Sequence, residues 1–186
     1  MTLPDDGAIG VQRRPRDPDR TKRDILVAAR EEFVEFGLDG ARIDRIAERA
    51  GANKQRIYAY FDSKDRLFDR VVEDRIEQLL DAVPFDAVDL PGYAVRLWEF
   101  NLAHPSLVRL LLWHALERPG EQLTHSVSSH ERKVAALRAV RGDDDWPADR
   151  LLGQVLGLVH GVTLAPGPDP EQTRADLHRA VSRLVG

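Results

Sequence analysis

Residues 51–68, GANKQRIYAYFDSKDRLF, decide the fold together with the short helix predicted just before them. Two short helices that cross steeply need a small residue where they touch, a turn residue free to adopt a positive φ, and an aliphatic residue that locks the second helix to the first. Ala47, Gly51 and Ile57 supply these features in register. The spacing therefore predicts a helix-turn-helix whose second helix runs over residues 54–60.

The segments on either side also have helical periodicity. Thr21 is a candidate N-cap for a first helix that stops at Gly37, and residues 43–50 form the first helix of the motif. Asp62 and Ser63 can cap a long helix over residues 64–80. Further helices are predicted over residues 91–103, 105–117, 121–140, 147–164 and 170–185. No stretch shows sustained two-residue alternation, so the predicted fold class is all-α.

Composition divides the chain into three predicted parts. Residues 1–19 are rich in proline, glycine and aspartate, which is typical of a flexible N-terminal arm. Residues 20–66 form the predicted helix-turn-helix domain. Residues 67–186 form a larger helical body, joined to the domain by the helix that starts near residue 64.

Charge is distributed unevenly along a chain of 186 residues and formal net charge −4. Residues 13–66 contain 14 Lys and Arg against 11 Asp and Glu, whereas residues 67–186 contain 13 against 18. A basic segment on an acidic body suggests a polyanionic partner at one end of the molecule. The cluster RRPR at residues 13–16 could follow DNA into a minor groove, but its Asp-Pro neighbours favour disorder.

Several classes of protein are disfavoured by the sequence. The chain has no cysteine, no long apolar run and no signal-like N-terminus, so we expect a cytoplasmic protein without disulfides or a membrane span. His125 and His130 are five residues apart and do not share a helical face, so no metal site is predicted. No catalytic motif and no cofactor-binding loop is present, so we expect neither an enzyme nor a cofactor.

Residues 21–68, TKRDILVAAREEFVEFGLDGARIDRIAERAGANKQRIYAYFDSKDRLF, resemble the DNA-binding domain of TetR-type (TetR/AcrR) transcriptional repressors. The resemblance rests on the Phe-Gly end of the first helix, the IA-RAG core of the motif and the IY-YF-SK-LF run that closes it. It implies an all-helical homodimer that binds a palindromic operator in double-stranded DNA. It also implies that a small-molecule effector in the C-terminal body releases the operator.

Base contacts are predicted at the start of the second motif helix, from Lys54, Gln55 and Arg56. Glutamine pairs with adenine, and arginine with guanine, through two hydrogen bonds in the major groove. Many members of the family have a small residue, often glycine, where this chain has Gln55 or Arg56. The bulkier side chains are expected to change which operator is read.

Phosphate contacts are predicted around the same helix. The resemblance places one tyrosine against a backbone phosphate, and Tyr58 is the better candidate because we expect Tyr60 to pack inward. Lys64 combines its own charge with the positive end of a helix dipole. Arg42 precedes the first motif helix and could approach a phosphate from the other side. The alternative is that these side chains form a solvated surface with ordinary packing.

The body contains apolar helices with a few polar groups that could line a ligand pocket. The predicted pocket residues are Trp98, Asn101, Leu110, Trp113, His114 and Val127. The alternative is that the tryptophans and leucines belong to the core and that His114 is a polar residue with its hydrogen bonds satisfied.

The last two predicted helices have broad apolar faces, with glycines at residues 153, 157 and 161 that permit close approach of another helix. The resemblance places a dimer interface there, and a palindromic operator also requires a two-fold dimer. The predicted interface residues are Leu152, Val155, Leu156, Val159, Leu177, Val181 and Leu184. The alternative is burial of these side chains within one subunit.

The resulting hypothesis is a ligand-responsive, dimeric transcriptional repressor. One alternative is a helical small-molecule-binding protein or enzyme without specific DNA binding. Another is a DNA-binding regulator that responds to a protein partner or to no ligand.

Overall fold

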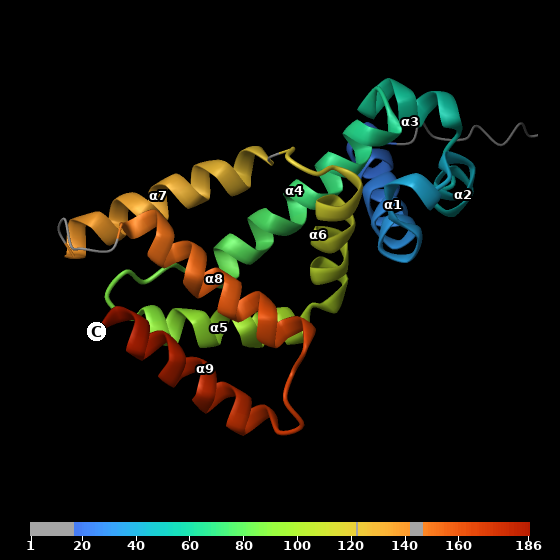
Figure 1. The fold of residues 1–186 in the computed structure, drawn as a ribbon. Helices are drawn as coiled ribbons and strands as arrows, with labels where there is room; N and C mark the ends of the chain where they lie inside the picture. Colours follow the sequence, from blue (N-terminus) through green and yellow to red (C-terminus); the bar gives the residue numbers. More distant parts are fainter. Residues whose placement is uncertain (1–16, 122, 142–146) are drawn as a thin grey trace, which may run out of the picture.

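The computed structural model describes residues 17–121, 123–141 and 147–186. In these ranges it consists of nine helices and contains no strand, so the predicted all-α fold class is confirmed (Figure 1). The helices are α1 (Pro18–Gly40), α2 (Ile43–Arg49), α3 (Lys54–Phe61), α4 (Lys64–Ala82), α5 (Leu90–Ala103), α6 (Pro105–Glu117), α7 (Thr124–Arg141), α8 (Ala148–Leu164) and α9 (Pro170–Val185). Residues 1–16, most of the predicted arm with its RRPR cluster, lie outside the described ranges.

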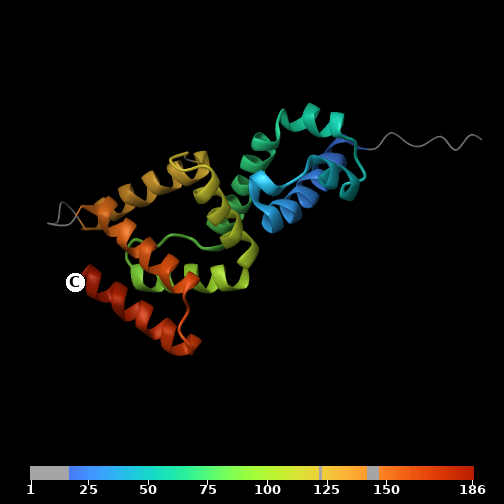
Figure 2. The same cartoon turned by 45° about the vertical axis from the view of Figure 1, so that its right-hand side comes forward.

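The molecule has a head and a body. Helices α1 to α3 form the head, and α5, α7, α8 and α9 form the body at the opposite end (Figures 1 and 2). Helix α4 runs from the head into the body, and α6 packs against both α1 and α4. Two helices therefore connect the part that carries the motif to the rest of the chain.

The turn between α2 and α3 is a Schellman motif. The N–H of Ala52 donates to the carbonyl of Ala47 (2.9 Å), and the N–H of Gly51 donates to that of Glu48 (3.1 Å). Gly51 adopts φ 56°, which costs glycine little. Ile57 is fully buried and Ala47 is 6% exposed, so both occupy the positions predicted for the lock and the small contact.

The first helix begins earlier than the sequence suggested. Asp17, and not Thr21, caps α1, with its carboxylate accepting the N–H of Asp19 (3.0 Å) and Pro18 in the first turn. Proline suits this position because its missing N–H would be unpaired there anyway. Thr21 instead lies inside the helix and donates its hydroxyl to the carbonyl of Asp17 (3.1 Å). Helical backbone geometry breaks at Gly37, as predicted, and resumes for one short turn.

Two apolar cores hold the described residues together. One joins α1, α2 and α3 to most of α4 and includes Phe33 and Phe68, whose rings meet edge to face at 5.0 Å. The other joins α5 to α8 and α9 around Tyr93 and Trp98. Helix α4 contributes to both, since Leu67 lies in the first core and Leu79 packs against the second.

The predicted dimer residues lie in the second core. Helix α5 packs closely against α8 and α9 and covers their apolar faces. The side chains that it buries are Leu152, Val155, Val159, Leu177 and Val181, whereas Leu156 and Leu184 are partly buried against the same core. A fully buried side chain has no surface left for a second subunit, so this placement corrects the residue-level prediction for these five.

Candidate DNA interface, head–body junction and ligand cavity

The start of α3 presents the side chains predicted to contact bases. Asn53 caps the helix by accepting the N–H of Arg56 (2.8 Å). Lys54, Gln55 and Arg56 are exposed, while Ile57 points into the core. In the described part of the chain, no hydrogen bond or ion pair engages the side chain of Gln55 or Arg56. These two side chains are therefore free to contact another molecule.

The two lysines are held within the head. Lys54 Nζ lies 2.5 Å from Asp44 Oδ1 on α2. Lys64 Nζ donates to the carbonyls of Asp39 and Ala41, each at 3.3 Å, and so braces the connection between α1 and α2. These contacts orient both ammonium groups before any partner arrives.

The remaining predicted phosphate contacts are at the surface. Tyr60 is partly buried against the head core, as expected for a packing residue, whereas Tyr58 is 45% exposed and stays a predicted phosphate contact. Arg42 is exposed at the N-cap of α2. The structure thus brings Arg42, Tyr58 and the α3 side chains to the surface of the head.

A buried carboxylate organises the base of α2. Glu32 on α1 is fully buried and accepts hydrogen bonds from Arg42 N (2.9 Å) and Arg45 Nε (2.6 Å). Arg49 Nη2 lies 3.9 Å from its second oxygen. Burial alone would raise the pKa of Glu32, but the hydrogen bonds and positive charges of these arginines lower it below its usual value. Glu32 therefore remains ionised and fixes α2 on α1.

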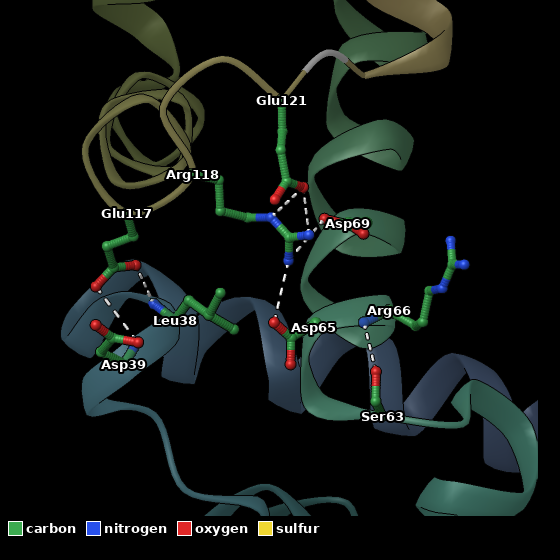
Figure 3. Close-up of polar contacts among 9 residues, drawn as sticks. All are labelled: Leu38, Asp39, Ser63, Asp65, Arg66, Asp69, Glu117, Arg118 and Glu121. Carbon is green, nitrogen blue, oxygen red and sulfur yellow. Dashed lines mark hydrogen bonds and ion pairs between the residues drawn. The ribbon is translucent and has the colours of Figure 1, made fainter.

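Glu117, the last residue of α6, is hydrogen-bonded to α1 (Figure 3). The carboxylate of Glu117 accepts the N–H groups of Leu38 (2.6 Å) and Asp39 (3.3 Å), just after the break at Gly37. One turn earlier on α6, Trp113 Nε1 donates to the carbonyl of Val34 (3.4 Å). The break in α1 exposes backbone donors that α6 then satisfies.

Arg118, the residue after α6, forms ion pairs with α4 (Figure 3). Arg118 Nη1 lies 3.2 Å from Asp65 Oδ1 and 3.6 Å from Asp69 Oδ1, both on the first turns of α4. The guanidinium also bonds Glu121 through Nε (2.8 Å) and Nη2. The side chain of Arg118 is 15% exposed, so solvent screens these ion pairs only partly. The end of α6 is thus held to α1 by Glu117, and the residue after it is held to the start of α4 by Arg118.

A cavity of about 440 Å³ opens among α4, α5, α6, α7 and α8. This volume lies in the range of small-molecule sites. Its wall is mostly aliphatic, with Ile76 and Leu80 from α4 and Leu112 from α6. The polar groups that interrupt the wall are Tyr93, Asn101, Ser126, Ser129, His130, Lys133, His160 and Thr163.

The predicted pocket residues are not brought together. Asn101 lines the cavity, with its amide nitrogen 3.4 Å from Thr163 Oγ1. Trp98 is buried in the second core, and Leu110 and His114 face the head core, where His114 stacks on Phe68 at 6.2 Å. Val127 and Trp113 are partly buried, and neither lines the cavity. Trp113 lies instead at the junction with α1.

The sequence reasoning missed Lys133, the one lysine among the described residues of the cavity wall. A signal for it existed: Ser129, Lys133 and Leu137 follow one another at four-residue spacing, which puts them on one helical face. Ser129 and Leu137 are both buried. A lysine on a face that is otherwise buried is rare enough to mark a candidate site.

Comparisons with known proteins agree with this architecture. Residues 25–71 match the family model "Bacterial regulatory proteins, tetR family", and residues 89–186 match "Tetracyclin repressor-like, C-terminal domain". The transcriptional repressor SCO4008 of Streptomyces coelicolor is 42% identical over 158 residues, covering 81% of this chain and 82% of that protein. The repressor NicS of Pseudomonas putida is 33% identical over 70% of this chain and 60% of its own length.

Solved structures show the same arrangement. The crystal structure of SCO4942 from Streptomyces coelicolor aligns with a TM-score of 0.75 at 32% identity, over 88% of this chain and 97% of that one. The chain belongs to the TetR family, and it is a ligand-responsive helix-turn-helix transcriptional regulator. Among the described residues, no helix is both long and apolar enough to cross a membrane.

Proposed function

We propose that the protein is a cytoplasmic, homodimeric repressor that binds a palindromic operator and releases it when a small molecule enters the cavity. The proposed DNA binding is supported by the side chains at the start of α3. Gln55 and Arg56 project there without partners among the described residues, on a helix that Ile57 locks in place. The 42% identity to the repressor SCO4008 supports repression.

The route from cavity to DNA follows α4 and α6. Both helices contribute to the cavity wall, through Leu80 on α4 and Ala115 on α6. The same two helices carry the contacts that hold the head, from Glu117 to α1 and from Arg118 to α4. An occupant that shifts either helix therefore changes the position of the head, and with it the separation of two α3 helices in a dimer.

The first prediction tests sequence-specific binding. From a pool of random duplex DNA, the protein is expected to enrich a palindrome whose half-sites lie about 34 Å apart, with affinity that falls steeply as salt rises. Gln55→Ala and Arg56→Ala should each weaken the selected operator by about 10–100-fold and relax the preference at one base pair per half-site.

The control for that experiment is Arg109→Ala, which removes one exposed positive charge from α6, outside the head. It should leave affinity and sequence preference unchanged. If no sequence is enriched, or if Arg109→Ala and Arg56→Ala behave alike, the alternative of a helical binding protein or enzyme without specific DNA binding replaces the repressor.

The second prediction concerns the dimer. The apolar faces of α8 and α9 are buried within the subunit, but Gly153, Gly157 and Gly161 form an exposed stripe on α8. No atom of the described residues lies within 4 Å of a Cβ added at these glycines. We propose that this stripe is where α8 meets its copy. Gly157→Arg should give a folded monomer at the 21.0 kDa chain mass and lose operator binding, as light scattering and a DNA titration would show.

A matched control is Ala135→Arg, on an exposed position of α7. It adds the same charge and bulk to another helix and should remain dimeric. A monomeric wild type, or a Gly157→Arg variant that is still dimeric, would contradict this interface.

A further inference from the structure

Lys133 places a positive charge in the wall of the cavity. Its Nζ donates a hydrogen bond to the hydroxyl of Tyr93 on α5 (2.9 Å). The same nitrogen lies 5.4 Å from the centroid of the Tyr93 ring and 5.8 Å from that of Phe85. The lysine is partly buried, and burial together with the neighbouring charge of Arg132 lowers its pKa. The groups that the ammonium is shown to contact, the Tyr93 hydroxyl and the rings of Tyr93 and Phe85, are therefore uncharged.

Among the described residues, no carboxylate compensates this charge. Lys133 forms no ion pair there, and the cavity wall includes no aspartate or glutamate. A charge withdrawn from water without a counter-ion is unfavourable, and proteins usually pair it. The cavity thus presents an ammonium group whose counter-ion has to come from whatever fills the space.

Tyr93 adds a second donor at the same place. Its side chain is 1% exposed, and burial raises its pKa to about 12, so the phenol keeps its proton. Because the hydroxyl oxygen accepts the hydrogen bond from Lys133, its own proton remains to be donated. An ammonium and a phenol side by side form a two-donor site that suits an anionic oxygen.

We propose that the effector is an organic anion: an apolar molecule with one acidic group, such as a carboxylate or sulfonate, that pairs with Lys133 and Tyr93 while its apolar part fills the aliphatic side of the cavity. This inference rests on the proposed function, since it names the class of molecule that the cavity takes. An organic cation would be repelled by Lys133 and would find no carboxylate in the described wall.

Two dyes of the same skeleton test the charge requirement. 8-Anilinonaphthalene-1-sulfonate is N-phenyl-1-naphthylamine with an added sulfonate, and both fluoresce when they enter an apolar site. The wild-type protein should bind the sulfonate at least about 10-fold more tightly than the neutral dye, because a charge-assisted hydrogen bond contributes that much or more.

The variants locate the effect. Lys133→Met should weaken binding of the sulfonate by about 10–100-fold and leave the neutral dye within about 2-fold. Tyr93→Phe should weaken the sulfonate by a smaller factor. Arg132→Met removes the neighbouring exposed charge and should change neither dye.

Circular dichroism confirms that each variant is folded, and Lys133→Gln replaces Lys133→Met if the latter is not. Equal affinities of the two dyes in the wild type, failure of both to bind, or a preference that survives the loss of Lys133 would overturn the proposal. Operator binding measured on the same preparations without dye tests the repressor itself. Failure of the anion site and failure of the proposed function are therefore separate results.

Discussion

Gly37→Ala is expected to lower the free energy of unfolding by about 2–5 kcal/mol, or Tm by roughly 5–15 °C. Gly37 has φ 69° and ψ −171°, a combination that is essentially restricted to glycine. An added Cβ would lie 2.6 Å from Glu117 Oε1 and 2.9 Å from two ring carbons of Trp113. Backbone strain and a steric clash therefore act together at this position.

The same substitution should loosen the head from the body. Glu117 must move to admit the methyl group, and its bonds to the N–H groups of Leu38 and Asp39 would be lost. Thermal unfolding followed by circular dichroism measures the loss of stability. Slowed hydrogen exchange at Leu38 in the wild type, lost in the variant, reports on the junction itself.

Gly120→Ala separates strain from the clash. Gly120 also has a positive φ, 84°, but an added Cβ would meet no atom of the described residues within 4 Å. Only the conformational cost of about 1–2 kcal/mol should then appear. If the two alanine variants are equally destabilised, the contact between α1 and α6 contributes nothing measurable.

The helix-turn-helix could be predicted because its determinants are local. The positions of Ala47, Gly51 and Ile57 are set by the geometry of one tight turn, and the structure contains that turn with the expected hydrogen bonds. The cap of α4 is local in the same sense: the sequence offered Asp62 and Ser63, and Ser63 caps the helix.

The cavity could not be predicted because it depends on the path of α6. Leu110 and Leu112 are equally apolar in the sequence, yet Leu110 faces the head core and Leu112 lines the cavity. Periodicity shows that such a helix is buried on most sides, but it does not show which neighbour covers each side. The crossing of α6 over α1 and α4 settles this, and it involves residues about 80 positions apart.

Five of the seven predicted interface side chains are buried within the subunit for a related reason. A broad apolar face on α8 indicates burial, but a second subunit and α5 of the same chain satisfy that requirement equally well. In the structure α5 covers Leu152 and Val155 through its own apolar face, which includes Tyr93 and Leu97. The exposed glycines on the opposite side of α8 form the surface that we propose for the partner.

Glu32→Ala is the second substitution expected to have a large effect, with a loss of about 2–4 kcal/mol in the free energy of unfolding at neutral pH. The variant would leave the N–H of Arg42 without its acceptor at the start of α2, and Arg45 without its carboxylate. The estimate stays below that for a fully buried ion pair because the Arg45 side chain is 35% exposed and can be hydrated. Operator binding should also weaken, since α2 supports α3.

Glu31→Ala is the matched control, one residue away on the same helix. Its carboxylate is exposed and lies 3.6 Å from Arg49 Nη1. A surface pair of this kind contributes little, so the change should be within about 0.5 kcal/mol. Both free energies of unfolding are measured by urea denaturation. Equal losses in the two variants would show that the buried Glu32 contributes no more to stability than the exposed Glu31.

The ionisation of Glu32 predicts how the effect depends on pH. Its pKa in the folded protein lies below the ordinary value of 4.5, so the native state binds this proton less readily than the unfolded state. The resulting stabilisation is present above pH 4.5 and is lost as the pH falls through the lower, folded-state pKa. Glu32→Gln keeps the shape but cannot ionise, so its deficit relative to the wild type should be largest near neutral pH and should shrink as the pH is lowered from about 7 through 4.5 and below. A deficit that stays constant over this interval would show that the arginines around Glu32 do not favour its charged form.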